Sequence, residues 1–222
     1  MPTAAIIKKG IFGGTFNPVH TGHVCLTEAL LKDFPLDRMI VVPTARPPHK
    51  PVDYIADPAD RFHMVGLAFE NMAGVSVSDA EMARTGPCYT IDTVRYFISS
   101  DPQSSFYLVL GLDAFLELDT WKSYLSLVAS LPLIVFTRTL DLASEKTAFE
   151  NFLTTTISKG YTFSEKQAGY IHPTLYPVFF YAARHFNVSA TGIRARIKAG
   201  LPIKGLVPDP VAQYIRKKGL YI

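Results

Sequence analysis

The amino-acid sequence predicts an α/β protein with a doubly wound, mainly parallel sheet and helices on both of its faces. Two observations favour this class. Short apolar runs recur along the 222 residues, and they are continuous rather than alternating, which is typical of strands buried on both faces. Segments with helical periodicity separate these runs, and such β-α alternation predicts parallel strands joined by crossover helices.

The predicted elements follow this alternation in order. Apolar runs predict strands at 6–12, 39–42, 75–77, 106–110, 133–136 and 178–181. Helical periodicity predicts helices at 23–33, 60–72, 91–99 and 121–129. Two further helices close the chain, one from near Ser189 to Gly200 and one from Pro208 to Gly219. Proline near a helix start and glycine at its end are typical boundary residues.

One stretch, from about residue 139 to residue 177, interrupts the alternation. It mixes polar and aromatic residues and contains one weak helical segment, 145–154. Because it is too short to bury a core of its own, we expect a single domain over 1–222 that carries an insertion at about 139–177.

Composition excludes several classes of protein. Hydrophobic residues make up 48% of the chain and charged residues 18%, so the chain is not of the disordered class. The net charge of +3 is too small for a nucleic-acid-binding protein but suits a cleft for anionic phosphates. The most apolar stretch, 127–136, is too short to cross a membrane. Cys25 and Cys88 show no metal or redox spacing, so we expect a cytoplasmic protein with reduced thiols.

The turn after the first predicted strand has the composition of a phosphate site. Gly13 and Gly14 allow a ligand to approach the backbone, and the following helix start adds unpaired N–H groups and a positive dipole end. His20 and His23 stand three residues apart on one face of the first helical turn. Taken singly, a glycine pair is often only a tight turn and a histidine only a helix cap. A zinc pair lacks a third ligand at a suggestive spacing.

The whole motif is more specific than its parts. A strand, the turn GGTFNP and the pattern H-x-G-H together resemble the nucleotidyltransferase superfamily, which shares H-x-G-H with class I aminoacyl-tRNA synthetases. Further motifs, in this order and spacing, resemble bacterial nicotinate-nucleotide adenylyltransferases: PPHK at 47–50, GPCYTIDT at 86–93, GLD at 111–113, WK at 121–122, SATGIR at 189–194 and LY at 220–221. The chain departs from this family at Ala190 and Cys88, where serine is usual, and in the length of 139–177.

This resemblance implies a Rossmann-like fold and a definite reaction. The phosphate of nicotinate mononucleotide attacks the α-phosphorus of ATP, which gives nicotinate adenine dinucleotide and pyrophosphate, a step of NAD biosynthesis. The attacking phosphate is already an anion, so catalysis needs positioning and charge stabilisation rather than a general base. The resemblance assigns His20 and His23 to the ATP phosphates. Mg²⁺ is expected as a cofactor held largely by the ATP phosphates, and the sequence names no protein ligand for it.

The resemblance also implies the residues that bind each substrate. The ATP-binding residues are Gly13, Gly14, Thr15, Phe16, Asp113, Ser189, Thr191 and Arg194. The mononucleotide-binding residues are His49, Lys50, Thr90, Trp121, Lys122 and Arg138. Trp121 is implied to stack on the pyridine ring, while amides near Thr90 and Lys122 hold its carboxylate. The structural alternatives are a helix cap for Ser189 or Asp113, a surface position for Arg194 and a core position for Trp121.

Other functions stay open on the sequence alone. The acceptor could be nicotinamide mononucleotide or pantetheine phosphate, although enzymes for the latter usually have threonine at the position of His20. A non-catalytic nucleotide sensor would keep the fold and bind ATP without releasing pyrophosphate. The expected partners are therefore small molecules, not nucleic acid or membrane, and the chain is expected to be a monomer or a homodimer.

Overall fold

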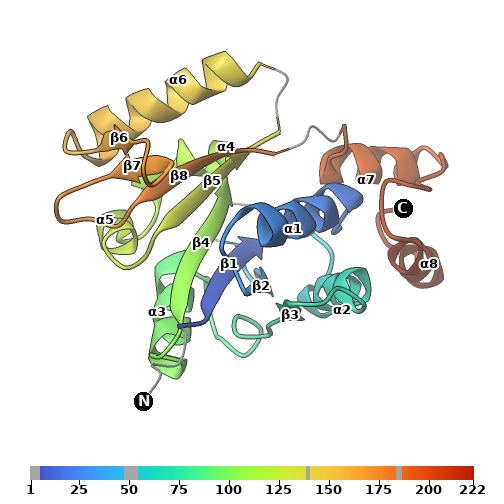
Figure 1. Cartoon of the computed structure of the whole chain (residues 1–222). Helices are drawn as coiled ribbons and strands as arrows, with labels where there is room; N and C mark the ends of the chain where they lie inside the picture. The colour runs from blue at the N-terminus through green and yellow to red at the C-terminus, as the bar shows by residue number, and fades with distance from the viewer. Residues whose placement is uncertain (1–5, 48–54, 139–140, 184–186) are drawn as a thin grey trace. The chain divides into compact units, whose positions relative to one another are not determined.

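The computed structural model describes residues 6–47, 55–138, 141–183 and 187–222 (Figure 1). The chain forms two compact units: the first takes its described residues from 1–12 and 89–185, and the second from 13–88 and 186–222. Two predicted site residues, His49 and Lys50, lie outside the described residues. The single-domain organisation expected from the sequence stays a prediction.

The sheet of the first unit is mainly parallel, which confirms the predicted fold class. Strand β1 (Lys8–Gly14) pairs with β4 (Ser105–Gly111), β4 with β5 (Leu133–Thr137), and β5 with β8 (Val178–Ala182), all in parallel. Gly111 pairs with Phe136 in register, so β4 and β5 end at the same edge. All five side chains of β5 are buried, as its unbroken apolar run predicts.

The described part of the segment 139–177 contains the helix predicted at 145–154, with shifted bounds, and a hairpin that the sequence did not predict. Helix α6 (Leu142–Phe152), capped by Asp141, continues as a π-helical turn (Leu153–Ile157). A short antiparallel hairpin, β6 (Thr162–Ser164) and β7 (Gly169–Ile171), then extends the sheet beyond β8. The hairpin escapes prediction because its strands have three residues each and one of their apolar side chains, Phe163, is 55% exposed.

Three helices and one 3₁₀ turn complete the first unit. These are α3 (Thr90–Ser100), α4 (Leu112–Phe115), the turn η2 (Leu118–Thr120) and α5 (Tyr124–Val128). The helix predicted from Trp121 is therefore wrong at its start. Trp121 has an extended backbone, and Ser123, with φ of 54°, lies in the left-handed region, so the helix begins only at Tyr124.

The second unit pairs β2 (Arg38–Pro43) with β3 (Val75–Val77) in parallel. Its helices are α1 (Thr21–Asp33), α2 (Pro58–Phe69), α7 (Ala190–Lys198) and α8 (Asp209–Lys218). Helix α8 is capped at its C-terminus by Gly219, whose φ of 62° suits glycine. It packs on α2, where Tyr214 donates a 2.6 Å hydrogen bond to Asp60.

Several predicted boundaries move by a few residues. Strand β1 begins at Lys8 rather than at residue 6, because Ile6 and Ile7 are 64% and 43% exposed. Helix α2 begins at Pro58, because Asp57 caps it by accepting from the Ala59 N–H, and ends at Phe69 rather than at residue 72. No helix in the described part of the chain is long and apolar enough to span a membrane.

Candidate active site

The turn that follows β1 belongs to the second unit and is fixed by hydrogen bonds on several sides. The Gly14 carbonyl accepts from the Thr44 N–H at 2.8 Å, and the Asn17 side-chain oxygen accepts from the Ala56 N–H at 3.0 Å. Phe16 holds a φ of 47°, which a non-glycine residue adopts only when its surroundings require it. The turn is thus shaped by its own protein contacts.

The two glycines of this turn differ in what they make possible. A Cβ on Gly13 would meet no atom within 4 Å, so the space beside Gly13 is open to a ligand. A Cβ on Gly14 would lie 3.0 Å from the ring of Phe16, so this glycine makes room for a protein side chain instead. The close approach expected for both glycines is therefore available at Gly13.

His20 and His23 lie against each other at the start of α1. His20 is the N-cap residue and is only 3% exposed. Its backbone N–H donates to Nδ1 of His23 at 3.1 Å, and the two rings stack with centroids 3.6 Å apart and planes 21° apart. The ring of Phe16 meets His23 edge-on at 5.0 Å. Because Nδ1 of His23 accepts this hydrogen bond, the neutral ring carries its own proton on Nε2.

Gly22, between the two histidines, is required by the packing of this pair. A Cβ at this position would lie 3.0 Å from Cγ1 of Val188 and 3.1 Å from Nδ1 of His20. Thr21 anchors the same turn by donating its N–H to the Leu206 carbonyl at 3.0 Å. The glycine of H-x-G-H therefore lets α1 approach Val188, two residues before α7, without displacing His20.

Helix α7 brings a second group of predicted ATP-binding residues to the turn after β1. The guanidinium of Arg194 donates to the Asn17 carbonyl at 2.8 Å and to the Thr191 hydroxyl at 3.2 Å. The Ser189 hydroxyl accepts from the Gly192 N–H at 3.1 Å and so caps the helix. A hydroxyl that accepts a hydrogen bond can still donate its proton, so the cap leaves Ser189 able to bind a phosphate oxygen.

Arg61, in the first turn of α2, was not predicted as a site residue. It is fully buried, and its guanidinium donates to four main-chain carbonyls, those of Thr15, Thr44, Ala45 and Ala56, at 2.6–2.9 Å. Burial lowers the pKa of Arg61, while the attraction of Tyr221 and nearby carboxylates acts in the opposite direction. The sequence did contain a signal that Arg61 is buried: its position places it on the same helix face as the apolar residues Met64, Val65 and Phe69.

The penultimate residue, Tyr221, also lies near these arginines. Its hydroxyl is buried and, within the described ranges, has no hydrogen-bond partner. Burial raises the pKa of Tyr221, and the positive charges of Arg61 and Arg194 partly offset that rise.

The first unit groups three predicted mononucleotide-binding residues. Thr90 is the first residue of α3, and Lys122 forms a 3.3 Å ion pair with Asp92 in the first turn of that helix. The Lys122 ammonium also lies 4.4 Å from the centre of the Tyr89 ring. Trp121, just before Lys122, is half-buried rather than part of the core.

Asp113 and Arg138 follow the carboxyl ends of two paired strands. Asp113 is exposed in the short helix α4, two residues after Gly111, and its carboxylate lies over the Gly111 backbone, where a Cβ would clash with it. Arg138 follows β5, with its guanidinium carbon 5.5 Å from the Phe136 ring. Because Gly111 and Phe136 pair in register, both residues stand at the strand edge where open α/β sheets bind ligands.

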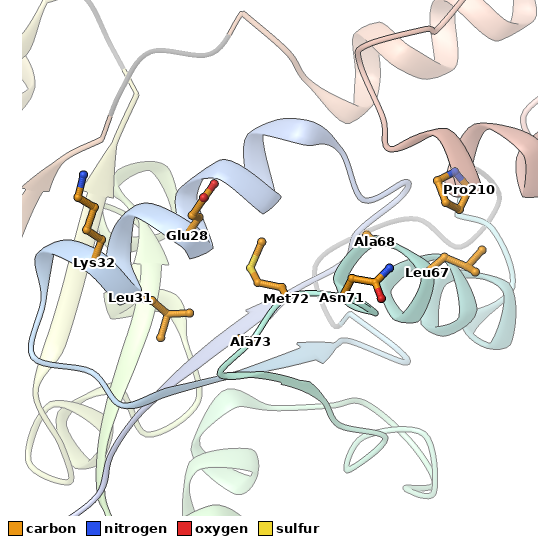
Figure 2. Close-up of a pocket in the computed structure, with 9 residues that line it drawn as sticks. All are labelled: Glu28, Leu31, Lys32, Leu67, Ala68, Asn71, Met72, Ala73 and Pro210. Carbon is orange, nitrogen blue, oxygen red and sulfur yellow. The ribbon is translucent and has the colours of Figure 1, made fainter.

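A separate hollow in the second unit contains none of the predicted site residues. It has a volume of about 720 Å³ and lies beside α1, the end of α2 and the first turn of α8 (Figure 2). Its lining residues are Glu28, Leu31, Lys32, Leu67, Ala68, Asn71, Met72, Ala73 and Pro210. Among the described residues, no group of three or more His, Cys, Asp or Glu side chains is placed to hold a metal ion.

A family model described as "Cytidylyltransferase-like" matches residues 11–196. Two solved structures share the fold: Plasmodium falciparum nicotinic acid mononucleotide adenylyltransferase in complex with NaAD (TM-score 0.72) and with APC (TM-score 0.70). Each is 17% identical, with 97% of both chains covered. Because the family model matches well over half of the chain, the protein belongs to the cytidylyltransferase-like class.

Similar proteins with curated names identify the family within this class. Proteins named "Probable nicotinate-nucleotide adenylyltransferase" are 34% identical in Desulfatibacillum aliphaticivorans and 33% identical in Geobacter sulfurreducens. The alignments cover 97% of this chain in both cases, and 100% and 98% of those relatives. The chain belongs to the nicotinate-nucleotide adenylyltransferase family.

Proposed function

We propose that this protein transfers AMP from ATP to nicotinate mononucleotide and releases pyrophosphate. Family membership across nearly the whole chain supports the reaction. The observation that carries the proposal is the His20–His23 pair, which presents a proton-bearing Nε2 at a turn whose Gly13 side is open. Such a turn at a helix start suits the phosphates of a nucleotide.

In the proposed mechanism an acceptor phosphate oxygen forms a bond to the α-phosphorus of ATP. The bond from that phosphorus to the bridging oxygen breaks, and pyrophosphate leaves with the electron pair. The Nε2–H of His23 donates to the phosphate oxygens, where negative charge builds up. Arg194 and the hydroxyls of Ser189 and Thr191 hold the triphosphate, and Asp113 contacts the nucleotide. MgATP is the proposed form of the substrate, with the ion held by phosphate oxygens and water.

Four of the proposed acceptor residues, Thr90, Trp121, Lys122 and Arg138, belong to the first unit. Trp121, half-buried and at the end of a 3₁₀ turn, offers a ring face for the pyridine. The first-turn amides of α3 at Thr90, together with the backbone at Lys122, suit the carboxylate of nicotinate. Arg138, with His49 and Lys50, is proposed for the mononucleotide phosphate.

A substrate panel tests this function. Pyrophosphate release from MgATP is measured with nicotinate mononucleotide, nicotinamide mononucleotide, pantetheine phosphate and no acceptor, and the dinucleotide product is identified by mass. We expect release with nicotinate mononucleotide to exceed that with the other acceptors. ATP binding without pyrophosphate release from any acceptor would instead identify a nucleotide sensor, and faster release with pantetheine phosphate would reassign the acceptor.

A further inference from the structure

The most unusual polar group outside the predicted site is the buried guanidinium of Arg61. A buried cation is costly unless it is paired and hydrogen-bonded, and its usual partner is a carboxylate. Here the hydrogen-bond partners of the guanidinium are main-chain carbonyls: Nε donates to Ala56, Nη1 to Thr15 and Thr44, and Nη2 to Ala45. Four of the five N–H donors of one side chain are thus used on backbone oxygens.

These carbonyls come from three separate segments of the second unit. Thr15 lies in the turn after β1, Thr44 and Ala45 follow β2, and Ala56 precedes α2. The planar guanidinium of Arg61 therefore joins the turn after β1 to the loop after β2 and to the residues before α2. A lysine ammonium, with three donors on a flexible stem, does not reproduce this geometry.

The hydrogen bond from Arg61 to the Thr15 carbonyl also fixes the direction of the next amide in the turn. In a planar trans peptide, the C=O of one residue and the N–H of the next point in opposite directions. Because the Thr15 carbonyl points at Arg61, the Phe16 N–H points away from Arg61. The Gly14 carbonyl is held by the Thr44 N–H in the same way, so the Thr15 N–H also points away from its anchor.

We propose that Arg61 is a positioning residue, which fixes the turn after β1 so that the amides of Thr15 and Phe16 face the phosphates of ATP. The inference rests on the proposed function, since it concerns the nucleotide of that reaction. Pre-organised amide donors stabilise phosphate charge without reorganising during the reaction. A buried positive charge directly behind the turn adds to the attraction for an anion.

The kinetic test compares Arg61→Lys with a matched core variant. Met64→Ala removes a fully buried side chain from the next turn of α2 and removes no hydrogen bond to the four carbonyls, because methionine has no donor group. Assays are run well below the unfolding midpoint of each variant. We expect Arg61→Lys to lower kcat/KM for ATP by about 10²-fold through both a higher KM and a lower kcat. The KM for the mononucleotide should stay near that of the wild type.

The control separates positioning from stability. Met64→Ala should lower the unfolding midpoint and leave both KM values and kcat nearly unchanged at the assay temperature. If Arg61→Lys keeps the wild-type kcat/KM for ATP, or loses no more activity than Met64→Ala, Arg61 is a structural residue only and the proposal is overturned.

A measurement on the wild-type protein decides the question even if Arg61 variants do not fold. Backbone ¹⁵N relaxation measured without any nucleotide should show that the amides of Thr15 and Phe16 are rigid, with order parameters of about 0.85. Values below about 0.6 would show a flexible turn and contradict positioning by Arg61. This readout, together with binding of a non-hydrolysable ATP analogue, does not depend on the acceptor. Failure of the proposed reaction would therefore be distinguishable from failure of this inference.

Discussion

The backbone N–H of His20 donates a 3.1 Å hydrogen bond to Nδ1 of His23, and the two rings stack 3.6 Å apart. One histidine thereby sets the tautomer of the other. Nδ1 of His23 acts as an acceptor, so Nε2 is the atom that carries the proton in the neutral ring. The spacing of H-x-G-H therefore does more than place two imidazoles on one face, since it also orients the donor.

The first prediction concerns this donor. Long-range ¹H–¹⁵N spectra of the neutral protein should show the Nε2–H tautomer for His23. His23→Ala should lower kcat by about 10²–10³-fold, because a donor to the developing charge is lost. His63→Ala is the matched control, since His63 is an exposed residue of α2. Near-wild-type kcat for His23→Ala would remove this turn from the catalytic centre.

Gly22 provides a second test of the histidine pair. In Gly22→Ala the new methyl group would meet His20 and Val188 at about 3 Å, so His20 must move. We expect kcat to fall by about 10-fold or more, because small displacements of positioning groups are costly. Gly66→Ala, in α2, is the control: a Cβ there meets nothing within 4 Å and should stabilise the helix by about 0.5–1 kcal/mol. Equal kinetics for both variants would contradict the steric argument.

Arg194 is tested through the substrate whose phosphates it is proposed to bind. Arg194→Lys keeps the charge but loses the fork that joins Asn17 and Thr191. The KM for ATP should rise and kcat should fall, while the KM for the mononucleotide changes little. Steady-state kinetics with each substrate varied in turn measure this. Arg216→Lys, an exposed position in α8, is the matched control, and an unchanged response to ATP would leave Arg194 only a structural bond to Asn17.

The segment 139–177 makes a larger contribution to packing than its composition suggests. Phe149 of α6 is fully buried, with its ring 5.0 Å from the rings of Phe115 and Phe180. Phe149→Ala should therefore destabilise the protein by about 3–5 kcal/mol. Phe163→Ala, at a 55% exposed position in β6, should cost less than about 1 kcal/mol. Denaturant unfolding of both variants measures the difference, and equal losses would mean that α6 does not contribute to the core.

Particular residues explain which features could be predicted from the sequence. Strands β4 and β5 were predictable because their apolar runs are continuous and mostly buried. The start of α5 was not, because the left-handed Ser123 carries no strong sequence signal. Arg61 was missed because a charged residue in a helix normally faces solvent. Its place on the apolar face of α2 was a signal of burial, but its four carbonyl partners could not be predicted from the sequence. The H-x-G-H spacing predicted a histidine pair, but not that a backbone N–H would occupy Nδ1 of His23.

The last prediction concerns Trp121, the single tryptophan of the chain and therefore a specific fluorescent reporter. If its ring stacks on the pyridine of the acceptor, nicotinate mononucleotide should quench its fluorescence, whereas ATP should have little effect. An aromatic stack contributes about 0.5–1.5 kcal/mol beyond area burial, so together with the lost contact area Trp121→Ala should raise the KM for the mononucleotide by about tenfold or more. Trp121→Phe, which keeps a ring, should recover part of that loss.

The same titration separates the two pyridine substrates. Nicotinamide mononucleotide has no carboxylate for the amides near Thr90 and Lys122, and a donor left without its partner discriminates strongly against the wrong ligand. We therefore expect weaker quenching and a higher KM with the nicotinamide compound. Equal use of both compounds would contradict the preference for nicotinate while leaving adenylyl transfer intact. The absence of both a quench and a mutant effect would assign Trp121 a packing role and reopen the identity of the acceptor.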